Sequence, residues 1–172
     1  MAGWTLHAAS AADADFLYRV YASTRHEELA PTGWSAEQQE AFLRQQFAAQ
    51  DTHYRQHYPA ARFDIVQAWG ERVGRLYVER RADEIRVLDI ALFPAFRRRG
   101  LGRALLEALV AEADAQGLRM SLHVERNNPA LALYRQLGFV PVDEQGVYWA
   151  MQRLPAAPGG YEKPALAGGM VS

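Results

Sequence analysis

Residues 85–109 constrain the fold of this chain more than any other stretch, because they predict a strand, a basic glycine loop and a helix in immediate succession. Residues 85–93 are mostly aliphatic, which is typical of a strand buried on both faces of a sheet. Pro94 cannot donate to a sheet ladder, so the strand is expected to end there. From Leu101 the apolar residues recur at the spacing of one helical face, and Gly117 is a candidate C-cap.

Residues 97–103 form the loop between this strand and this helix, with the sequence RRRGLGR. Its glycines let the backbone turn tightly and approach a ligand, while the first N–H groups of the following helix face the gap unpaired. The arginines raise the local positive potential. The loop therefore predicts an anion site, for which a diphosphate is the natural ligand. The alternative is a solvated basic turn on the surface.

Two familiar phosphate loops do not fit this sequence. The chain contains no G-x-x-x-x-G-K-[ST], so a nucleoside triphosphatase loop is not supported. The dinucleotide fingerprint G-x-G-x-x-G requires a third glycine where this chain has Leu105.

The rest of the chain predicts an α/β (α+β) fold with a largely antiparallel sheet. Ser35 followed by Gln38 is a capping box, and residues 119–125 should lie parallel to residues 85–93 because a helix connects the two strands. Further strands are expected at residues 4–7, 63–69, 72–80, 139–142 and 147–154, and helices from Ser10, from Ser35 and over residues 130–136.

Composition indicates an ordinary globular protein. The 172 residues are 49% hydrophobic and 23% charged, which predicts a single domain over residues 1–154. The tail at residues 155–172 is rich in proline and glycine and is expected to be flexible. A net charge of -1 gives no reason to expect nucleic acid or a membrane as partner. With no targeting segment recognised, a cytoplasmic monomer or homodimer is expected.

No metal site is expected. Cysteine is absent, and the pair His53 and His57 lacks the glutamate of H-E-x-x-H. Residues 25–34 mix charge, proline, glycine and tryptophan, so Arg25 and Trp34 are weak candidates for substrate contacts. The alternative is a surface loop whose tryptophan covers the edge of the core.

Two motifs together resemble those of the GNAT superfamily of N-acetyltransferases. The first is R-x-x-G-x-G at Arg97, Gly100 and Gly102, and the second is NNPALALYRQLGF at residues 127–139. The resemblance implies a mixed, mostly antiparallel sheet of six to seven strands flanked by helices. Its central parallel strand pair would splay apart after Leu92 and leave a cleft for the pantetheine arm of acetyl-CoA.

The resemblance also implies how acetyl-CoA is held as co-substrate. Backbone groups of the central strand would bind the pantetheine, loop residues the diphosphate, and an asparagine at the start of the later helix the pantetheine again. Asn127 keeps the family's distance to the tyrosine, whereas Asn128 precedes the proline, so the choice between them stays open. The implied cofactor-binding residues are Ile90, Ala91, Leu92, Arg97, Arg98, Arg99, Gly100, Leu101, Gly102, Arg103, Asn127, Asn128, Ala130 and Tyr134.

The resemblance finally implies an acyltransferase that moves an acetyl group to a primary amine of a small molecule or a peptide N-terminus. Tyr134 matches the tyrosine that protonates the departing thiolate, a task that suits a phenol. His123 and Asp89 are both candidates for the general base, and the alternative for each is a structural role. Without cysteine, direct transfer in a ternary complex is expected. The alternative is a catalytically silent acyl-CoA-binding sensor module.

Overall fold

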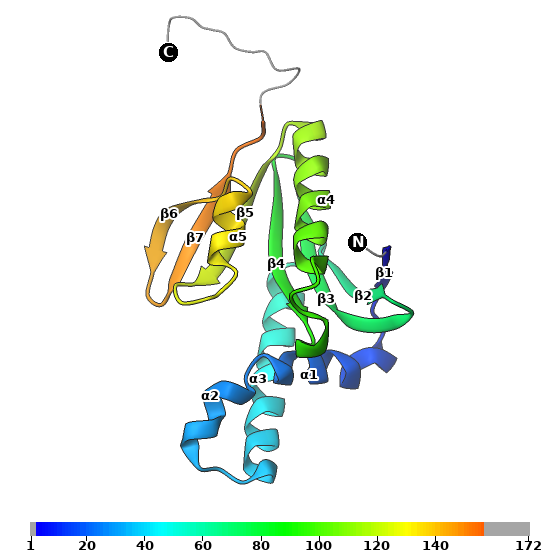
Figure 1. Cartoon of the computed structure of the whole chain (residues 1–172), viewed down its shortest axis with the longest axis vertical. Coiled ribbons are helices and arrows are strands. Elements are labelled where there is room, and N and C mark those ends of the chain that lie inside the picture. Colours follow the sequence, from blue (N-terminus) through cyan, green and yellow to red (C-terminus); the bar gives the residue numbers. More distant parts are fainter. Residues whose placement is uncertain (1–2, 157–172) are drawn as a thin grey trace, which may run out of the picture. The chain divides into compact units, whose positions relative to one another are not determined.

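A computed structural model describes residues 3–156, which form a seven-stranded mixed sheet flanked by helices (Figure 1). The strand order is β1-β2-β3-β4-β5-β7-β6. The described chain falls into two compact units. One contains the residues up to Glu79 together with Leu88–Gly102, and the other contains Arg80–Val87 and the residues from Arg103 onward. The predicted flexible tail lies outside the described residues, apart from its first two positions.

The first unit is built on antiparallel strands. β1 (Trp4–Ala8) pairs with β2 (Arg62–Ala68), which pairs with β3 (Glu71–Arg80). β4 (Glu84–Leu92) follows β3 after a short turn, and its residues from Leu88 onward belong to this unit. The strands predicted at residues 4–7, 63–69, 72–80 and 85–93 are confirmed.

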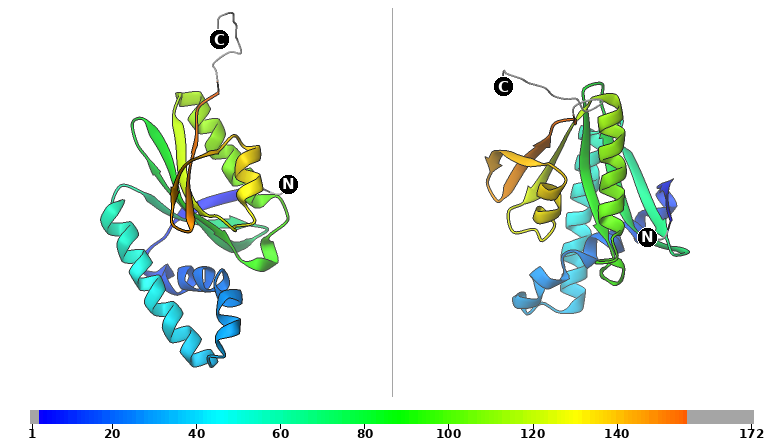
Figure 2. Two further views of the ribbon diagram at one scale, coloured as in Figure 1. Left: turned by 90° about the vertical axis from the view of Figure 1, so that its left-hand side faces the viewer. Right: turned by 45° about the horizontal axis from the view of Figure 1, so that its top comes forward.

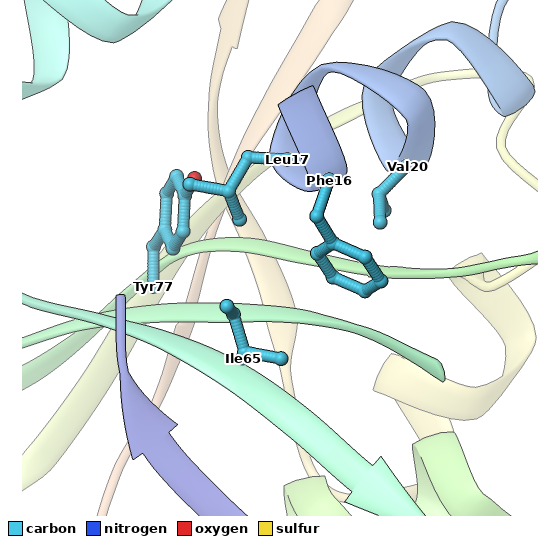
Figure 3. Packing of buried hydrophobic residues seen from close by; sticks show 5 residues of the cluster. All are labelled: Phe16, Leu17, Val20, Ile65 and Tyr77. Carbon is cyan, nitrogen blue, oxygen red and sulfur yellow. The ribbon is translucent and has the colours of Figure 1, made fainter. Parts of the chain in front are cut away.

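Helices pack on the strands of the first unit. α1 (Ala14–Ser23) follows the short η1 (Ala11–Asp13), and α3 (Ala36–His57) begins after Ser35. The predicted capping box at Ser35 is confirmed, since Gln38 N donates to the Ser35 side chain. Figure 3 shows the core of this unit, with side chains of α1 directed at those of β2 and β3. The residues drawn are Phe16, Leu17, Val20, Ile65 and Tyr77.

The second unit contains the first part of β4 and most of the elements that follow it in the chain, which can be traced by colour in Figure 2. They are α4 (Leu101–Gln116, whose first two residues belong to the first unit), β5 (Arg119–Glu125), α5 (Leu131–Gln136), β6 (Val140–Gln145) and β7 (Tyr148–Arg153). β5 lies parallel to β4, as predicted, and β7 lies between β5 and β6. The Arg153 guanidinium binds the Asp114 carboxylate at 2.8 Å, which joins the end of β7 to α4.

The central strand differs from the prediction in two respects. The ladder between β4 and β5 ends at Val87 opposite Leu122, so β4 continues to Leu92 without β5 as its partner. The parallel pairing therefore stops before Asp89 rather than after Leu92. In addition, only the first part of β4 is mostly buried, and every residue from Leu88 to Leu92 is partly accessible.

Residues 25–34, predicted as a loop, are largely helical and contain α2 (His26–Leu29) and η2 (Ala30–Thr32). The helix predicted from Ser35, α3, continues through both histidines to His57. Both segments carry few buried apolar residues, so the hydrophobic period that predicts a helix was weak there. No helix among residues 3–156 is long and apolar enough to cross a membrane.

Candidate functional site

The predicted anion loop follows β4 and the short η3 (Pro94–Phe96). Arg98 and Gly100 adopt positive φ angles of 62° and 84°, which turn the backbone sharply into the first residue of α4. A Cβ added to Gly102 would meet no atom within 4 Å. The loop thus leaves open space beside the first turn of a long helix, where N–H groups lack intrahelical acceptors.

The arginines of this loop have different surroundings. Arg97 Nε donates to the carbonyl oxygen of Leu92 at 3.0 Å, which closes the loop onto the end of β4. Arg99 lies over the rings of Trp69 and Phe96, with its Cζ 5.1 Å and 5.6 Å from their centroids. Arg103, in the second unit, donates to Gln136 of α5. Among the described residues, the Arg98 side chain makes no hydrogen bond or ion pair. The four arginines predicted to bind the cofactor therefore differ in how many of their donors are already used.

The strand residues predicted to bind pantetheine pass close to β3. A Cβ on Gly74 would collide with the carbonyl oxygen of Ala91 and lie 2.8 Å from Leu92 Cδ2. The N–H of Phe93 donates to Val73 O at 2.9 Å. Glycine is therefore required at position 74 for the backbone of β4 to take this path.

Asp89 forms a buried ion pair with Arg75 of β3. The Arg75 side chain is 2% exposed and the Asp89 side chain 19% exposed. Arg75 Nη2 also donates to Gln50 Oε1 at 2.8 Å, whereas Nε and Nη1 are buried without an acceptor among the described residues. A lone acid in this strand needs a partner, as predicted, and the partner is Arg75.

Tyrosines surround this ion pair. The Arg75 guanidinium lies 4.8 Å from the ring centroid of Tyr77 and 5.8 Å from that of Tyr21. Tyr54 donates its hydroxyl hydrogen to Leu88 O at 3.2 Å. Burial raises the pKa of Tyr54, and the nearby Asp89 carboxylate raises that pKa further. Tyr54 is therefore neutral at physiological pH and acts as a hydrogen-bond donor.

His123 of β5 lies in the second unit and accepts a hydrogen bond at Nδ1 from Arg86. A guanidinium can only donate, so the neutral ring must carry its proton on Nε2. Arg86 also donates to Ser121 Oγ at 3.0 Å. Partial burial lowers the pKa of His123 below its ordinary value, and the positive charge of Arg86 lowers it further. His123 is thus neutral at pH 7, with its basic nitrogen facing Arg86.

Tyr134 and the two asparagines lie in the same unit as His123. The Tyr134 side chain is buried, and its ring meets Phe139 edge-on with centroids 5.9 Å apart. Asn128 Oδ1 accepts from Ala130 N at 2.8 Å, so this side chain caps the start of α5. Asn127 is exposed and its side chain makes no hydrogen bond within the described chain. The two asparagines, equivalent in sequence, therefore differ in their availability to a ligand.

The two weak substrate candidates have local partners. Arg25 binds Glu28 at 2.9 Å and lies over the ring of Tyr21. Trp34 is 39% exposed and packs edge-on against Phe42. His53 and His57 stack on one another at 4.2 Å, and within residues 3–156 no three metal-binding side chains come together.

Three residues at these places did not stand out in the sequence. Arg75 and Arg86 each lie within an apolar strand, and the rule that singled out Asp89, a charge in an apolar run, applies to both. Trp69 gave only the signal of a residue before Gly70 in a turn. Its contact with the anion loop depends on packing between segments distant in sequence.

Comparison with known proteins gives curated relatives that are named as acetyltransferases. A ribosomal protein bS18-alanine N-acetyltransferase of Salmonella typhimurium strain LT2 is 48% identical over 59 residues, covering 33% of this chain and 40% of the relative. A mycothiol acetyltransferase of Thermobifida fusca strain YX is 43% identical over 67 residues, covering 39% of this chain and 19% of the relative. The chain thus matches less than half the length of these curated relatives.

A solved structure shares the fold. The PaiA N-acetyltransferase of Thermoplasma acidophilum, in complex with coenzyme A, superposes with a TM-score of 0.66 at 20% identity, covering 88% of this chain and 99% of that one. The sequence model of the acetyltransferase (GNAT) family matches residues 17–139, which include both motifs. The match spans most of the sequence, and the chain therefore belongs to the acetyltransferase (GNAT) family.

Proposed function

We propose that this protein transfers the acetyl group of acetyl-CoA directly to a primary amine. The observation that carries the proposal is the loop between β4 and α4, where Gly100 at φ 84° and the open space beside Gly102 expose the first turn of the helix. A diphosphate fits such a place through backbone N–H groups and arginine side chains. Membership of the GNAT family supports the same ligand.

Acetyl-CoA is proposed to bind along residues of both motifs. Ile90, Ala91 and Leu92 would bond the pantetheine through their backbone, which is partly accessible in this half of β4. Of the two asparagines, we propose Asn127 as the pantetheine contact because the Asn128 side chain already caps α5. The diphosphate would take the N–H groups of the loop from Arg98 onward.

Tyr134 is proposed as the general acid that protonates the CoA thiolate. A phenol remains protonated at neutral pH and delivers its proton to a strong base. Tyr134 follows the pantetheine-binding start of α5 at the family's spacing. Its ring is fixed against Phe139, which limits its rotation.

Asp89 and His123 remain the two candidates for the general base. Asp89 Oδ2 accepts from Arg75, and its other oxygen is left with acceptor capacity. His123 has its single acceptor nitrogen occupied by Arg86. We therefore propose Asp89 as the first choice, with His123 able to act only after Arg86 has moved away from Nδ1.

The transfer is proposed to pass through a ternary complex, in which the amine nitrogen attacks the thioester carbonyl carbon. The C–N bond forms as the C–S bond breaks, the base takes the amine proton, and Tyr134 gives its proton to sulfur. The sequence holds no cysteine, and Ser121 has no Ser-His-acid arrangement, because its hydroxyl oxygen accepts a hydrogen bond from Arg86. No covalent acetyl-enzyme is expected.

The acceptor class is proposed as a small-molecule amine or a peptide N-terminus. The name of the bS18-alanine N-acetyltransferases supports including peptides that begin with alanine among the acceptors tested. We also propose a cytoplasmic monomer or homodimer. The net charge of -1 gives no general attraction to nucleic acid or an anionic membrane, so neither is proposed as a partner.

A thiol-release assay tests this function. The intact protein and acetyl-CoA are incubated with polyamines, aminoglycosides, amino acids and peptides, and free CoA is measured. Release that depends on one acceptor class supports the transferase. Calorimetric binding of acetyl-CoA without release for any amine would instead establish the sensor. Radiolabelled acetyl retained on the denatured protein would contradict direct transfer.

A further inference from the structure

Trp69 stands at the tip of the turn between β2 and β3 in a backbone conformation that tryptophan rarely adopts. Its φ angle is 52°, and Gly70 follows at 74°. Left-handed backbone is unfavourable for a residue with a bulky side chain, whereas glycine and asparagine adopt it readily. A requirement other than the geometry of the turn therefore favours a tryptophan at this position.

The indole ring meets the segment that begins the anion loop. Trp69 and Phe96 stack with their centroids 5.9 Å apart and their planes 13° apart. The Cζ atom of Arg99 lies 5.1 Å from the Trp69 centroid and 5.6 Å from the Phe96 centroid. All three residues belong to the same compact unit. Two aromatic rings thus hold one cation of the loop.

The contact with the two rings leaves the N–H donors of the Arg99 guanidinium available for hydrogen bonds. An attraction between a cation and an aromatic ring uses the charge and the π system, so it consumes no N–H group. Among the described residues, the Arg99 side chain makes no hydrogen bond or ion pair. Arg97 and Arg103, in contrast, already donate to Leu92 and Gln136. Arg99 is therefore fixed in position and still able to donate.

We propose that Trp69 is a positioning residue of the anion loop, which holds Arg99 where its guanidinium donates to a phosphate of acetyl-CoA. The inference rests on the proposed function, because it takes acetyl-CoA as the ligand. The phosphate is either in the diphosphate or at the ribose 3′ position, and both accept charge-assisted hydrogen bonds from a guanidinium.

Calorimetric titration of the full-length chain tests this role with three ligands: acetyl-CoA, dephospho-acetyl-CoA and S-acetylpantetheine. Trp69→Asn removes the ring but suits the left-handed backbone, and Trp69→Phe keeps a ring as the matched control. Trp69→Asn should raise the Kd for acetyl-CoA about two- to sixfold. Arg99→Gln should raise it about ten- to a hundredfold, and Trp69→Phe by about twofold or less.

Further arms separate a positioning role from a structural one. Neither Trp69→Asn nor Arg99→Gln should change the Kd for S-acetylpantetheine, which has no phosphate. In the Arg99→Gln background, Trp69→Asn should add no further loss, because the two residues act as a unit. If the effect of Arg99→Gln disappears with dephospho-acetyl-CoA, Arg99 serves the 3′-phosphate, and if it persists, the diphosphate.

Three results would overturn the inference: unchanged acetyl-CoA affinity in Trp69→Asn, equal weakening of S-acetylpantetheine, or full additivity of the two substitutions. Thermal unfolding of each variant shows whether a weakened variant is folded. A wild-type chain that binds no acetyl-CoA would refute the proposed function together with this inference. A wild-type chain that binds it, with variants that bind equally well, would refute this inference alone.

Discussion

Truncation of Asp89 should destabilise the fold strongly, because it leaves the Arg75 guanidinium buried without its counter-charge. Arg75 is 2% exposed, and two of its nitrogens already lack acceptors among the described residues. Breaking a buried ion pair from one side costs about 3–5 kcal/mol. The lower end applies here, since Asp89 is 19% exposed and Gln50 still accepts from Nη2. We expect Asp89→Ala to lower the free energy of unfolding by about 3 kcal/mol.

Urea unfolding followed by circular dichroism measures this loss. For a chain of this length, about 3 kcal/mol corresponds to a decrease in Tm of about 6–12 °C. Asp89→Asn is the matched control, because its amide oxygen still accepts from Arg75 and the loss should be smaller. The double variant Arg75→Met/Asp89→Leu removes both charges and should recover most of the stability of the wild type.

Two results would refute this reasoning. One is an Asp89→Ala variant within about 0.5 kcal/mol of the wild type, the range of ordinary surface substitutions. The other is a double variant as unstable as Asp89→Ala, which would place the loss outside the ion pair. The same variants separate structure from chemistry: a folded Asp89→Asn that has lost its turnover would identify the carboxylate as the base.

Four further predictions concern single residues. Tyr134→Phe should lower kcat about ten- to a thousandfold in the thiol-release assay with little change in the Kd for acetyl-CoA, and a wild-type rate would refute its role as acid. Gly102→Asp should abolish acetyl-CoA binding in calorimetry, whereas Gly102→Asn, the uncharged isostere, should bind acetyl-CoA more weakly than the wild type but measurably. The helix should tolerate the aspartate, because acidic residues suit its first turn. The folded-state pKa of His123 lies below 6.5, so the folded chain binds fewer protons there than the unfolded chain, and stability should fall as the pH drops from 6.5 through that lower pKa; NMR titration should show the pKa rise in Arg86→Met, and an unmoved pKa would contradict the contact. Gly74→Ala should reduce the Tm and weaken acetyl-CoA binding together, because its Cβ collides with a backbone carbonyl of β4; an unchanged melting curve would show that β4 shifts freely.

Signals that are local in sequence predicted most of the elements. The capping box at Ser35 and the helix end at Gly117 each depend on neighbouring residues, and both are confirmed. The parallel direction of β5 followed from the general handedness and length of a strand-helix-strand crossover. The position of the glycine loop between a strand and a helix was also predictable, because its residues are contiguous in the sequence.

Contacts between distant segments were not predictable in this way. Asp89 needed a partner, but the sequence does not tell that Arg75, on the neighbouring strand, supplies it. The β4–β5 ladder ends at Val87, well before Pro94, so the proline that predicts the end of the strand does not mark the end of the pairing. The contact of Trp69 with Arg99 likewise joins a hairpin turn to a loop some thirty residues later.

The two candidate bases differ in how many acceptor positions their arginine partners leave. Each is held by a guanidinium, Asp89 by Arg75 and His123 by Arg86, and a guanidinium only donates. A carboxylate has two oxygens, so Asp89 accepts from Arg75 and can still receive a proton. A neutral imidazole has one acceptor nitrogen, and Arg86 occupies it. The pattern of hydrogen bonds therefore supports the proposal of Asp89 as the base, with His123 able to act only after Arg86 has moved away from Nδ1.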